Sequence, residues 1–394
     1  SIPIICKEIA EIPPTKKNHG RVIYNGAGTP KAYITNEIYE KTLSKLLAEK
    51  TGLTKVLSNI RITGIFNRIM TENIDNPNIA KISEDIAKLS DMAKKTKEHK
   101  VYIPIKGLDM LESAEYAFSS RIKLHNLNLK PIEQVLPKDS FNDKDIQYLS
   151  PTIIEVTTTT ADYTKSSELA IEIGKFIVNY FRLADFYGWD EDNLAVRLPG
   201  FGGLRESMMA YAVPKNQNIT LRYLQVNEYS EDYEFDEEDM KFLSSGRLGD
   251  LLDKYLEHKL DTMEKSILRA LIWFGESKVE HDLGARFIKL TLAIETLLNS
   301  NDSDPITATL RDRTAFILGN KAHERITIAK EMNELYKQRS GIVHHGKSDV
   351  DLKSLLLLES YAAELIRVFL SNIDYTEIRT KKELQDKLEK LKYR

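Results

Sequence analysis

The chain has 394 residues, of which 42% are hydrophobic and 29% are charged. A chain of this length usually folds as more than one domain, and its composition is typical of a globular protein. The formal net charge of −3 excludes a general basic field, so a nucleic-acid site has to be a local patch or a small reactive cleft. The single cysteine, Cys6, excludes an internal disulfide and a zinc site built on several cysteines.

The chain also lacks the patterns that direct a protein to a membrane. No apolar run approaches the roughly 20 residues that span a bilayer. The segment that begins Ser1-Ile2-Pro3 has no basic stretch followed by an apolar core, so it does not resemble a signal peptide. Together with the single cysteine, these features predict a cytoplasmic protein with no membrane association.

Residues 1 to 255 mix helix and strand patterns, which predicts an amino-terminal mixed α/β domain. Helices are expected over Asn36–Glu49, over Asn76–Lys97 and from Leu169 to Ala184, the last with Ser166 or Ser167 as its cap. Alternation and β-branched residues predict the strands. Pro104 cannot donate to a ladder, so its strand should be an edge strand. The strands are expected at Val101–Ile105, Arg121–His125, Ile153–Thr160 and Ile219–Val226.

From about Leu251 the pattern changes to helices without convincing strands. Apolar residues recur at steps of three and four in five successive segments, and short connections separate them. Such helices should pack as a bundle. We therefore expect an α+β protein in which residues 1–255 form the mixed domain and residues 256–394 form an all-α bundle. The charged amphipathic segment Thr380–Arg394 is expected to be its last helix.

One segment carries residues suited to chemistry on RNA. A helix is predicted to end near Arg339, and His344 and His345 follow it. RNA supplies its own nucleophile, the 2′-hydroxyl. A histidine can act as acid or base at neutral pH, and a guanidinium can stabilise the phosphorane with two hydrogen bonds. Arginine plus histidine is therefore a sufficient catalytic set that needs no metal and no cofactor.

The spacing leaves two interpretations open. Five positions along an ideal helix turn by roughly 140°, so Arg339 and His344 would not share one face. Gly341 would have to distort the helix, or a two-fold dimer would have to bring two copies of the pair into one cleft. The alternative is a structural arginine and histidine near a helix end.

The pattern of an arginine, four residues and a histidine, from Arg339 to His344, resembles the signature of the HEPN superfamily. The surrounding segments are similar to the ApeA-like group of that superfamily. His345 gives the five-residue spacing that the superfamily also uses. The resemblance covers about residues 258 to 372, and the strand from Val101 to Leu108 is similar to the front half of such proteins. The segments that carry it are Trp273-Phe274, Arg286–Leu290, Ala293–Leu298, Leu310–Arg313 and Leu335–Ser340.

This resemblance implies a HEPN helical bundle that dimerises through its signature helices. It implies an endoribonuclease in which the arginine and histidine of both protomers line one cleft, with products that end in a 2′,3′-cyclic phosphate. By the same resemblance, Arg339 stabilises the phosphorane and His344 is the general acid or base. Ser340 stands where the superfamily often has a larger polar residue.

Further residues have supporting roles in this interpretation. Glu295 would orient the arginine across the bundle, although a packing role fits it equally well. His345 is the alternative to His344 as the catalytic histidine. Lys337 and Lys347 would contact RNA phosphates, and ordinary solvated lysines are the competing interpretation.

The sequence thus predicts a cytoplasmic, homodimeric, metal-independent endoribonuclease, a hydrolase that acts in antiviral or stress defence. The amino-terminal domain would sense a trigger, such as a regulatory partner or a phage-derived molecule, or would select the RNA. The alternative is a non-catalytic HEPN-type module that binds RNA, a nucleotide or a partner protein in a defence or toxin–antitoxin system.

Overall fold

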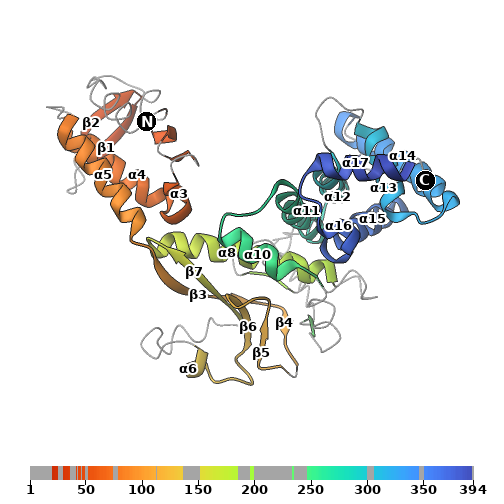
Figure 1. Ribbon diagram of the computed structural model, residues 1–394, viewed down its shortest axis with the longest axis horizontal. Coiled ribbons are helices and arrows are strands. Elements are labelled where there is room, and N and C mark those ends of the chain that lie inside the picture. Colours follow the sequence, from red (N-terminus) through yellow and green to blue (C-terminus); the bar gives the residue numbers. More distant parts are fainter. Residues whose placement is uncertain are drawn as a thin grey trace, which may run out of the picture. The chain divides into compact units, whose positions relative to one another are not determined.

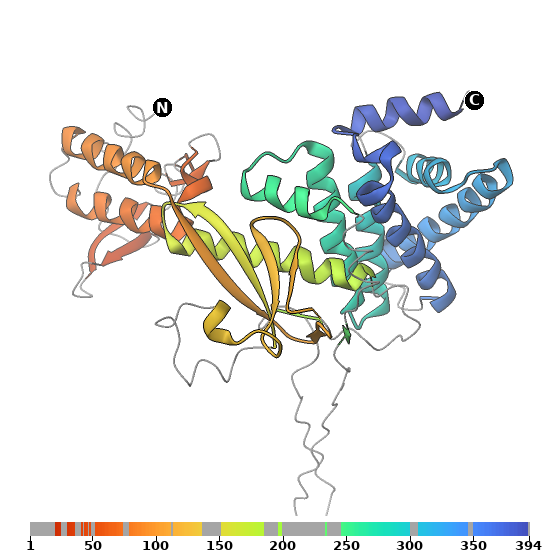
Figure 2. The same ribbon diagram turned by 60° about the horizontal axis from the view of Figure 1, so that its bottom comes forward.

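The protein is described from a computed structural model (Figures 1 and 2). Two sequence expectations lie largely or wholly outside the residues it describes: most of the helix at Asn36–Glu49, and the strand at Ile219–Val226. The structure describes residues 20–24, 30–35, 41, 43–45, 47–48, 52–73, 79–111, 113–135, 151–184, 196–198, 233–234, 246–299, 306–345 and 350–392.

The fold is α+β, as predicted, and the chain divides into two compact units. The first unit comprises Ser1–Val101 and Thr157–Ile171, and the second comprises Tyr102–Val156 and Glu172–Arg394. The domain boundary expected between residues 255 and 256 stays a prediction. No described helix is long and apolar enough to cross a membrane.

The first unit is built around a pair of amphipathic helices, α4 and α5 (Figure 1). Helix α5 confirms most of the helix expected over Asn76–Lys97, but it ends at Lys94 and Lys97 begins β3. Helix α4 was not predicted. Their apolar stripes meet in a core that includes Phe66, Ile69 and Ile82. The elements are β1 (Gly20–Tyr24), β2 (Pro30–Thr35), α3 (Leu53–Val56), α4 (Asn59–Asn73) and α5 (Ile79–Lys94), and β1 pairs with β2 in an antiparallel ribbon.

The second unit contains most of a four-stranded sheet in the order β3-β7-β6-β5. The predicted strands are confirmed as parts of β3, β6 and β7, and β3 lies at the edge of the sheet, as its Pro104 requires. Helix α8 lies across one face of this sheet (Figure 2), where Phe181 contacts Phe118 edge to face. The bounds are β3 (Lys97–Ile105), β4 (Leu108–Asp109), β5 (Glu115–Ala117), β6 (Ile122–Asn126), α6 (Ile132–Val135), β7 (Thr152–Thr160) and β8 (Tyr233–Glu234).

Helix α8 begins earlier than its apolar stripe indicates, at Tyr163, and ends at Ala184. The predicted cap at Ser166 or Ser167 is therefore wrong. Asp162 accepts the backbone N–H of Lys165 at 2.9 Å, which is the bond an N-terminal cap makes. Both serines lie inside the helix, and their hydroxyls bond to carbonyls one turn back.

The described residues from Leu248 onward are mainly helical, as the periodicity predicts. Helix α11 packs on α12 and α15, and α13 packs on α14. Phe274, Phe287 and Phe369 are fully buried among these helices. The bounds are α10 (Leu248–Leu256), α11 (Thr262–Lys278), α12 (Leu283–Leu298), α13 (Ile306–Leu318), α14 (Ala322–His345), α15 (Leu352–Ser371), α16 (Ile373–Thr376) and α17 (Lys381–Lys392).

A buried carboxylate holds three of these helices together. Glu359 of α15 is 1% exposed. It lies 2.6 Å from Nζ of Lys278 on α11 and 2.6 Å from Nη2 of Arg286 on α12. A carboxylate removed from water is stable only with such partners.

We expect Glu359→Gln to lower the free energy of unfolding by about 3 kcal/mol, because it leaves two largely buried cations facing a neutral amide. Urea denaturation followed by circular dichroism measures the loss. The matched control is Glu364→Gln on the same helix, where the carboxylate is 41% exposed and pairs with Arg367 at 3.4 Å. Its loss should be below about 1 kcal/mol. Equal effects of the two substitutions would contradict the role given to Glu359.

Candidate functional site

The arginine and histidine of the signature lie on one uninterrupted helix. Helix α14 runs from Ala322 to His345, so the helix end expected near Arg339 is wrong. Gly341 neither ends nor distorts the helix, and it costs only about 1 kcal/mol relative to alanine in such a position. The residue that follows it, Ile342, lies close to Gly284 of α12, where a β-carbon would be 3.5 Å from its Cγ2.

Arg339 points toward helix α12 and faces Glu295 there. The guanidinium Nη2 lies 3.7 Å from Oε1 of Glu295, and the two side chains are 28% and 17% exposed. Glu295 lies in the last turn of α12, where Arg313 and Lys381 bind the carbonyls of the helix end. These basic side chains complement the negative end of the helix dipole. They hold in place the end of α12 that carries Glu295.

Tyr336 is the third member of this network and was not predicted from the sequence. It lies one turn before Arg339 on α14, and its hydroxyl donates to Oε1 of Glu295 at 3.4 Å. Burial raises the pKa of Tyr336 well above its ordinary value, and the carboxylate acts in the same direction. The available signal was the three-residue spacing, which places Tyr336 and Arg339 on neighbouring parts of one helix face.

Burial also raises the pKa of Glu295, against the opposing effects of Arg339 and of the Tyr336 hydrogen bond. The carboxylate is thus less well solvated than an exposed one and depends on its two partners when it is ionised.

Arg339 keeps hydrogen-bonding capacity that the protein does not use. Its Nε is buried and has no hydrogen-bond partner, and the 3.7 Å separation from Glu295 exceeds a normal hydrogen bond. The side chain is 28% exposed, so the exposed part of the guanidinium could donate to a phosphate oxygen, and a rotation that uncovers Nε would complete the two-pronged contact of arginine–phosphate pairs. The contact with Glu295 orients the guanidinium without saturating it.

His344 does not join this network within one chain. Its side chain is exposed. Five positions of an ideal helix separate it from Arg339 by about 7.5 Å of rise and about 140° of rotation. Arg339 faces α12, so His344 lies on a different side of α14. Within a single copy of the described residues, the two side chains do not converge on one point.

The other predicted residues are placed only in part. Ser340 is exposed, and its side chain makes no hydrogen bond among the residues that the structure describes. Lys337 is exposed and pairs with Glu334 at 2.6 Å, as expected of a solvated lysine. His345 ends α14, but its side chain is not among the described ones, and Lys347 lies outside the described residues.

Exposed apolar side chains flank the carboxyl-terminal half of α14. Val343 on α14 is 45% exposed, and Leu352 and Leu356 in the first turns of α15 are 55% and 42% exposed. Gln338 of α14 bonds to Ser354 at 2.8 Å, so these turns of α15 lie beside the signature. Leu352 and Leu356 each stand two positions from Ser354, a rotation of about 200° on an ideal helix, so they point away from this contact.

Among the residues that the structure describes, no three histidine, cysteine or carboxylate side chains are grouped as metal ligands. No known protein family, curated protein or solved structure matches the chain. The function is therefore inferred from the residues themselves.

The raised pKa of Glu295 gives a prediction about stability and pH. The folded chain keeps this proton at pH values at which the unfolded chain has lost it, so the contribution of Glu295 to stability is fully present below the unfolded pKa. It is lost as the pH rises through the folded pKa. The difference in free energy of unfolding between wild type and Glu295→Gln should therefore fall as the pH rises above the ordinary pKa of a glutamate.

Urea denaturation at a series of pH values measures this difference. Glu334→Gln provides the matched control, because Glu334 is an exposed carboxylate on α14. If the difference in free energy of unfolding between wild type and Glu295→Gln stays constant or grows as the pH rises, burial does not determine the pKa shift of Glu295.

Proposed function

We propose that this protein is a metal-independent endoribonuclease of the HEPN type, whose active centre is composed of two copies of the chain. The observation that carries the proposal is the state of Arg339. Its guanidinium is oriented by Glu295, remains partly exposed and keeps an unused donor. An exposed imidazole, that of His344, follows on the same helix.

In the proposed reaction, a histidine removes the proton of the 2′-hydroxyl, and the 2′-oxygen forms a bond to the adjacent phosphorus. The bond from phosphorus to the 5′-oxygen of the next nucleotide breaks, and that oxygen takes a proton from an acid. Arg339 stabilises the extra negative charge of the phosphorane. The products are a 2′,3′-cyclic phosphate and a 5′-hydroxyl.

The geometry of α14 is the reason for proposing two copies. Because Arg339 and His344 face different sides of one helix, a second α14 related by a two-fold axis is the simplest way to bring both groups to one phosphate. The exposed Val343 on the same helix would be covered in such a pair. Homodimerisation through this face is therefore part of the proposal.

The other elements of the proposal follow from the resemblance. The amino-terminal region would sense a trigger or select the RNA, and the enzyme would act in antiphage or stress defence in the cytoplasm. Lys337 would gain a phosphate contact only by leaving Glu334, which makes it a weaker candidate than Arg339.

Labelled RNA incubated with the full chain and EDTA tests the activity. We expect cleavage to persist in the chelator and to fall by at least about 100-fold in Arg339→Ala and in His344→Ala, the range for loss of an acid–base or electrostatic group. His323→Ala is the matched control, because His323 is an exposed histidine at the other end of α14. Circular dichroism establishes that each variant is folded.

Mixing the two inactive variants tests the composite centre. A mixed pair contains one intact Arg339 and one intact His344, on different chains, so partial activity should return. Absence of any return, with dimers present in sedimentation, would contradict an active centre shared between copies. RNA that binds through Arg339 but stays intact would favour the non-catalytic alternative.

A further inference from the structure

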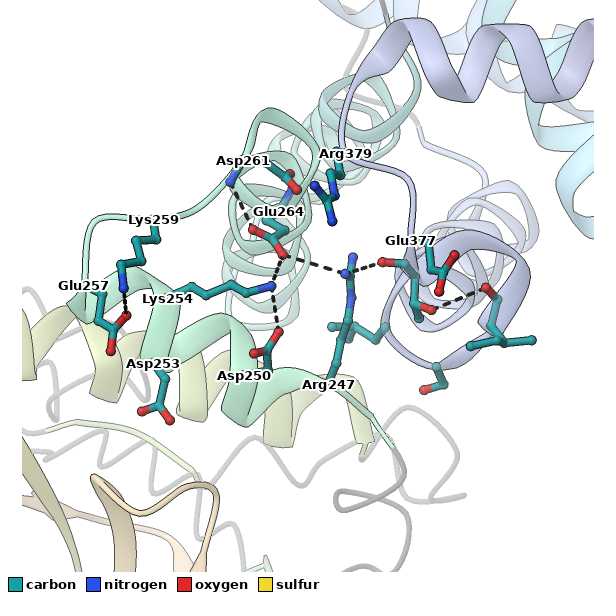
Figure 3. A pocket seen from close by; sticks show the side chains of 14 residues that line it. Arg247, Asp250, Asp253, Lys254, Glu257, Lys259, Asp261, Glu264, Glu377 and Arg379 are labelled. Atoms are coloured by element: carbon teal, nitrogen blue, oxygen red, sulfur yellow. Dashed lines mark hydrogen bonds and ion pairs between the residues drawn. The ribbon is translucent and has the colours of Figure 1, made fainter.

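A second site lies in the same unit, away from the signature residues. A cavity of about 1050 Å³ opens between helix α10, the start of α11 and the ends of α15 and α16 (Figure 3). Its volume lies just above the usual range for small-molecule sites. Arg339, Glu295 and His344 do not line it, so the cavity is separate from the proposed RNA-cleaving centre.

Most charged groups that line the cavity are already engaged within the protein. Glu264 is the most buried of them, with a side chain that is 4% exposed. Such internal pairing stabilises the walls and leaves little capacity for a ligand. The engaged carboxylates are Asp250 and Glu264 with Lys254, Glu257 with Lys259 and Arg121, Asp253 with the hydroxyl of Ser119, and Asp261 with the backbone N–H of Glu264.

Arg247 is the exception among the buried groups. Its Nη1 donates to the carbonyl of Thr376 and lies 3.8 Å from Glu264. Its Nε and Nη2 are buried and have no hydrogen-bond partner. Burial lowers the pKa of this guanidinium. Buried donors without acceptors are costly. The Arg247 side chain lines the cavity and is 17% exposed, so a small rotation of its guanidinium would bring these donors to an acceptor there.

Two further side chains of the cavity have unused charge, and both are close to Thr376 in the chain. Arg379 and Glu377 are exposed, and their side chains make no ion pair among the described residues. Figure 3 shows Arg379 and Arg247 pointing into the cavity from opposite walls, with Glu377 at its side. The backbone of Arg379 is fixed, because its carbonyl accepts the N–H of Met263 at 2.9 Å.

We propose that this cavity binds a small amino-carboxylate, a molecule that carries one carboxylate and at least one ammonium group. The carboxylate lies between the guanidiniums of Arg247 and Arg379, and an ammonium group pairs with Glu377. Guanidinium and carboxylate match in shape and charge. The three unused groups of the cavity are thus complementary to the two ends of one ligand.

The net charge of the lining favours amino-carboxylates over phosphates and other anions. Six carboxylates line the cavity against four basic side chains, namely Arg247, Lys254, Lys259 and Arg379. The surplus of negative charge repels phosphates and nucleic acid, whereas it attracts a ligand whose ammonium groups outnumber its carboxylates.

Three related probes test the proposal on the full chain by isothermal titration calorimetry and by ligand-dependent thermal stability. L-lysine carries both kinds of group, 1,5-diaminopentane is L-lysine without the carboxylate, and hexanoate is L-lysine without the amines. We expect saturable binding and stabilisation by L-lysine, with weaker binding of the other two and of inorganic phosphate.

Arg379→Gln should weaken the binding of L-lysine by about tenfold, as expected for loss of one charge-assisted hydrogen-bonded contact. Lys382→Gln is the matched control, because Lys382 is an exposed cation three positions away that does not line the cavity. Glu377→Gln should weaken L-lysine more than hexanoate. Both substituted side chains of the cavity are exposed, so the fold should survive each change.

Three outcomes would overturn the proposal: no saturable binding of L-lysine, equal binding of phosphate or hexanoate, or equal affinity of wild type and Arg379→Gln. Equal binding of 1,5-diaminopentane and L-lysine would also overturn it, by showing that the guanidiniums do not take a carboxylate. These results are separate from the RNA-cleavage test, because Arg339 and His344 do not line the cavity. Failure of ligand binding would leave the proposed cleavage untouched, and loss of cleavage in Arg339→Ala would leave the cavity lining unchanged.

Discussion

A carboxylate taken out of water needs a cation, and this requirement sets the arrangement of the carboxyl-terminal helices. Three glutamates in this region are buried or nearly so, and each faces a basic side chain from another helix. These contacts limit which helix faces can meet, in addition to the apolar stripes, which tolerate small rotations. The pairs are Glu264 of α11 with Lys254 of α10, Glu359 of α15 with Lys278 and Arg286, and Glu295 of α12 with Arg339 of α14.

Local patterns in the sequence predict the fold wherever one residue type dominates the local conformation. Pro104 identifies an edge strand because its missing N–H acts in every context. The extent of α14 was not predictable in this way. Ser340 and Gly341 indicate a helix end by propensity, but α14 continues past them to His345, and propensity is routinely overridden by tertiary context. Helix α4 was missed although Ile62, Phe66 and Ile69 follow helical spacing.

The two sites differ in how far they can be predicted from the sequence. Arg339 and His344 are close together in the chain, and Glu295 was available as a partner through the HEPN resemblance. The cavity beside α10 has no such signal, because its lining comes from segments more than 100 residues apart and no spacing relates Arg247 to Arg379. A buried donor without a hydrogen-bond partner can be recognised only from the structure, because all the neighbours of the group have to be known. A sequence motif needs no such knowledge.

The continuity of helix α14 has a consequence for how the proposed enzyme would be controlled. A rigid helix leaves no hinge between Arg339 and His344, so no rearrangement inside one chain can assemble the reactive pair. Assembly then depends on encounter, and below the dissociation constant of the pair the amount of active enzyme rises with the square of protein abundance. A scarce protein would stay silent, and a modest local enrichment, for instance on a shared scaffold, would raise its output steeply.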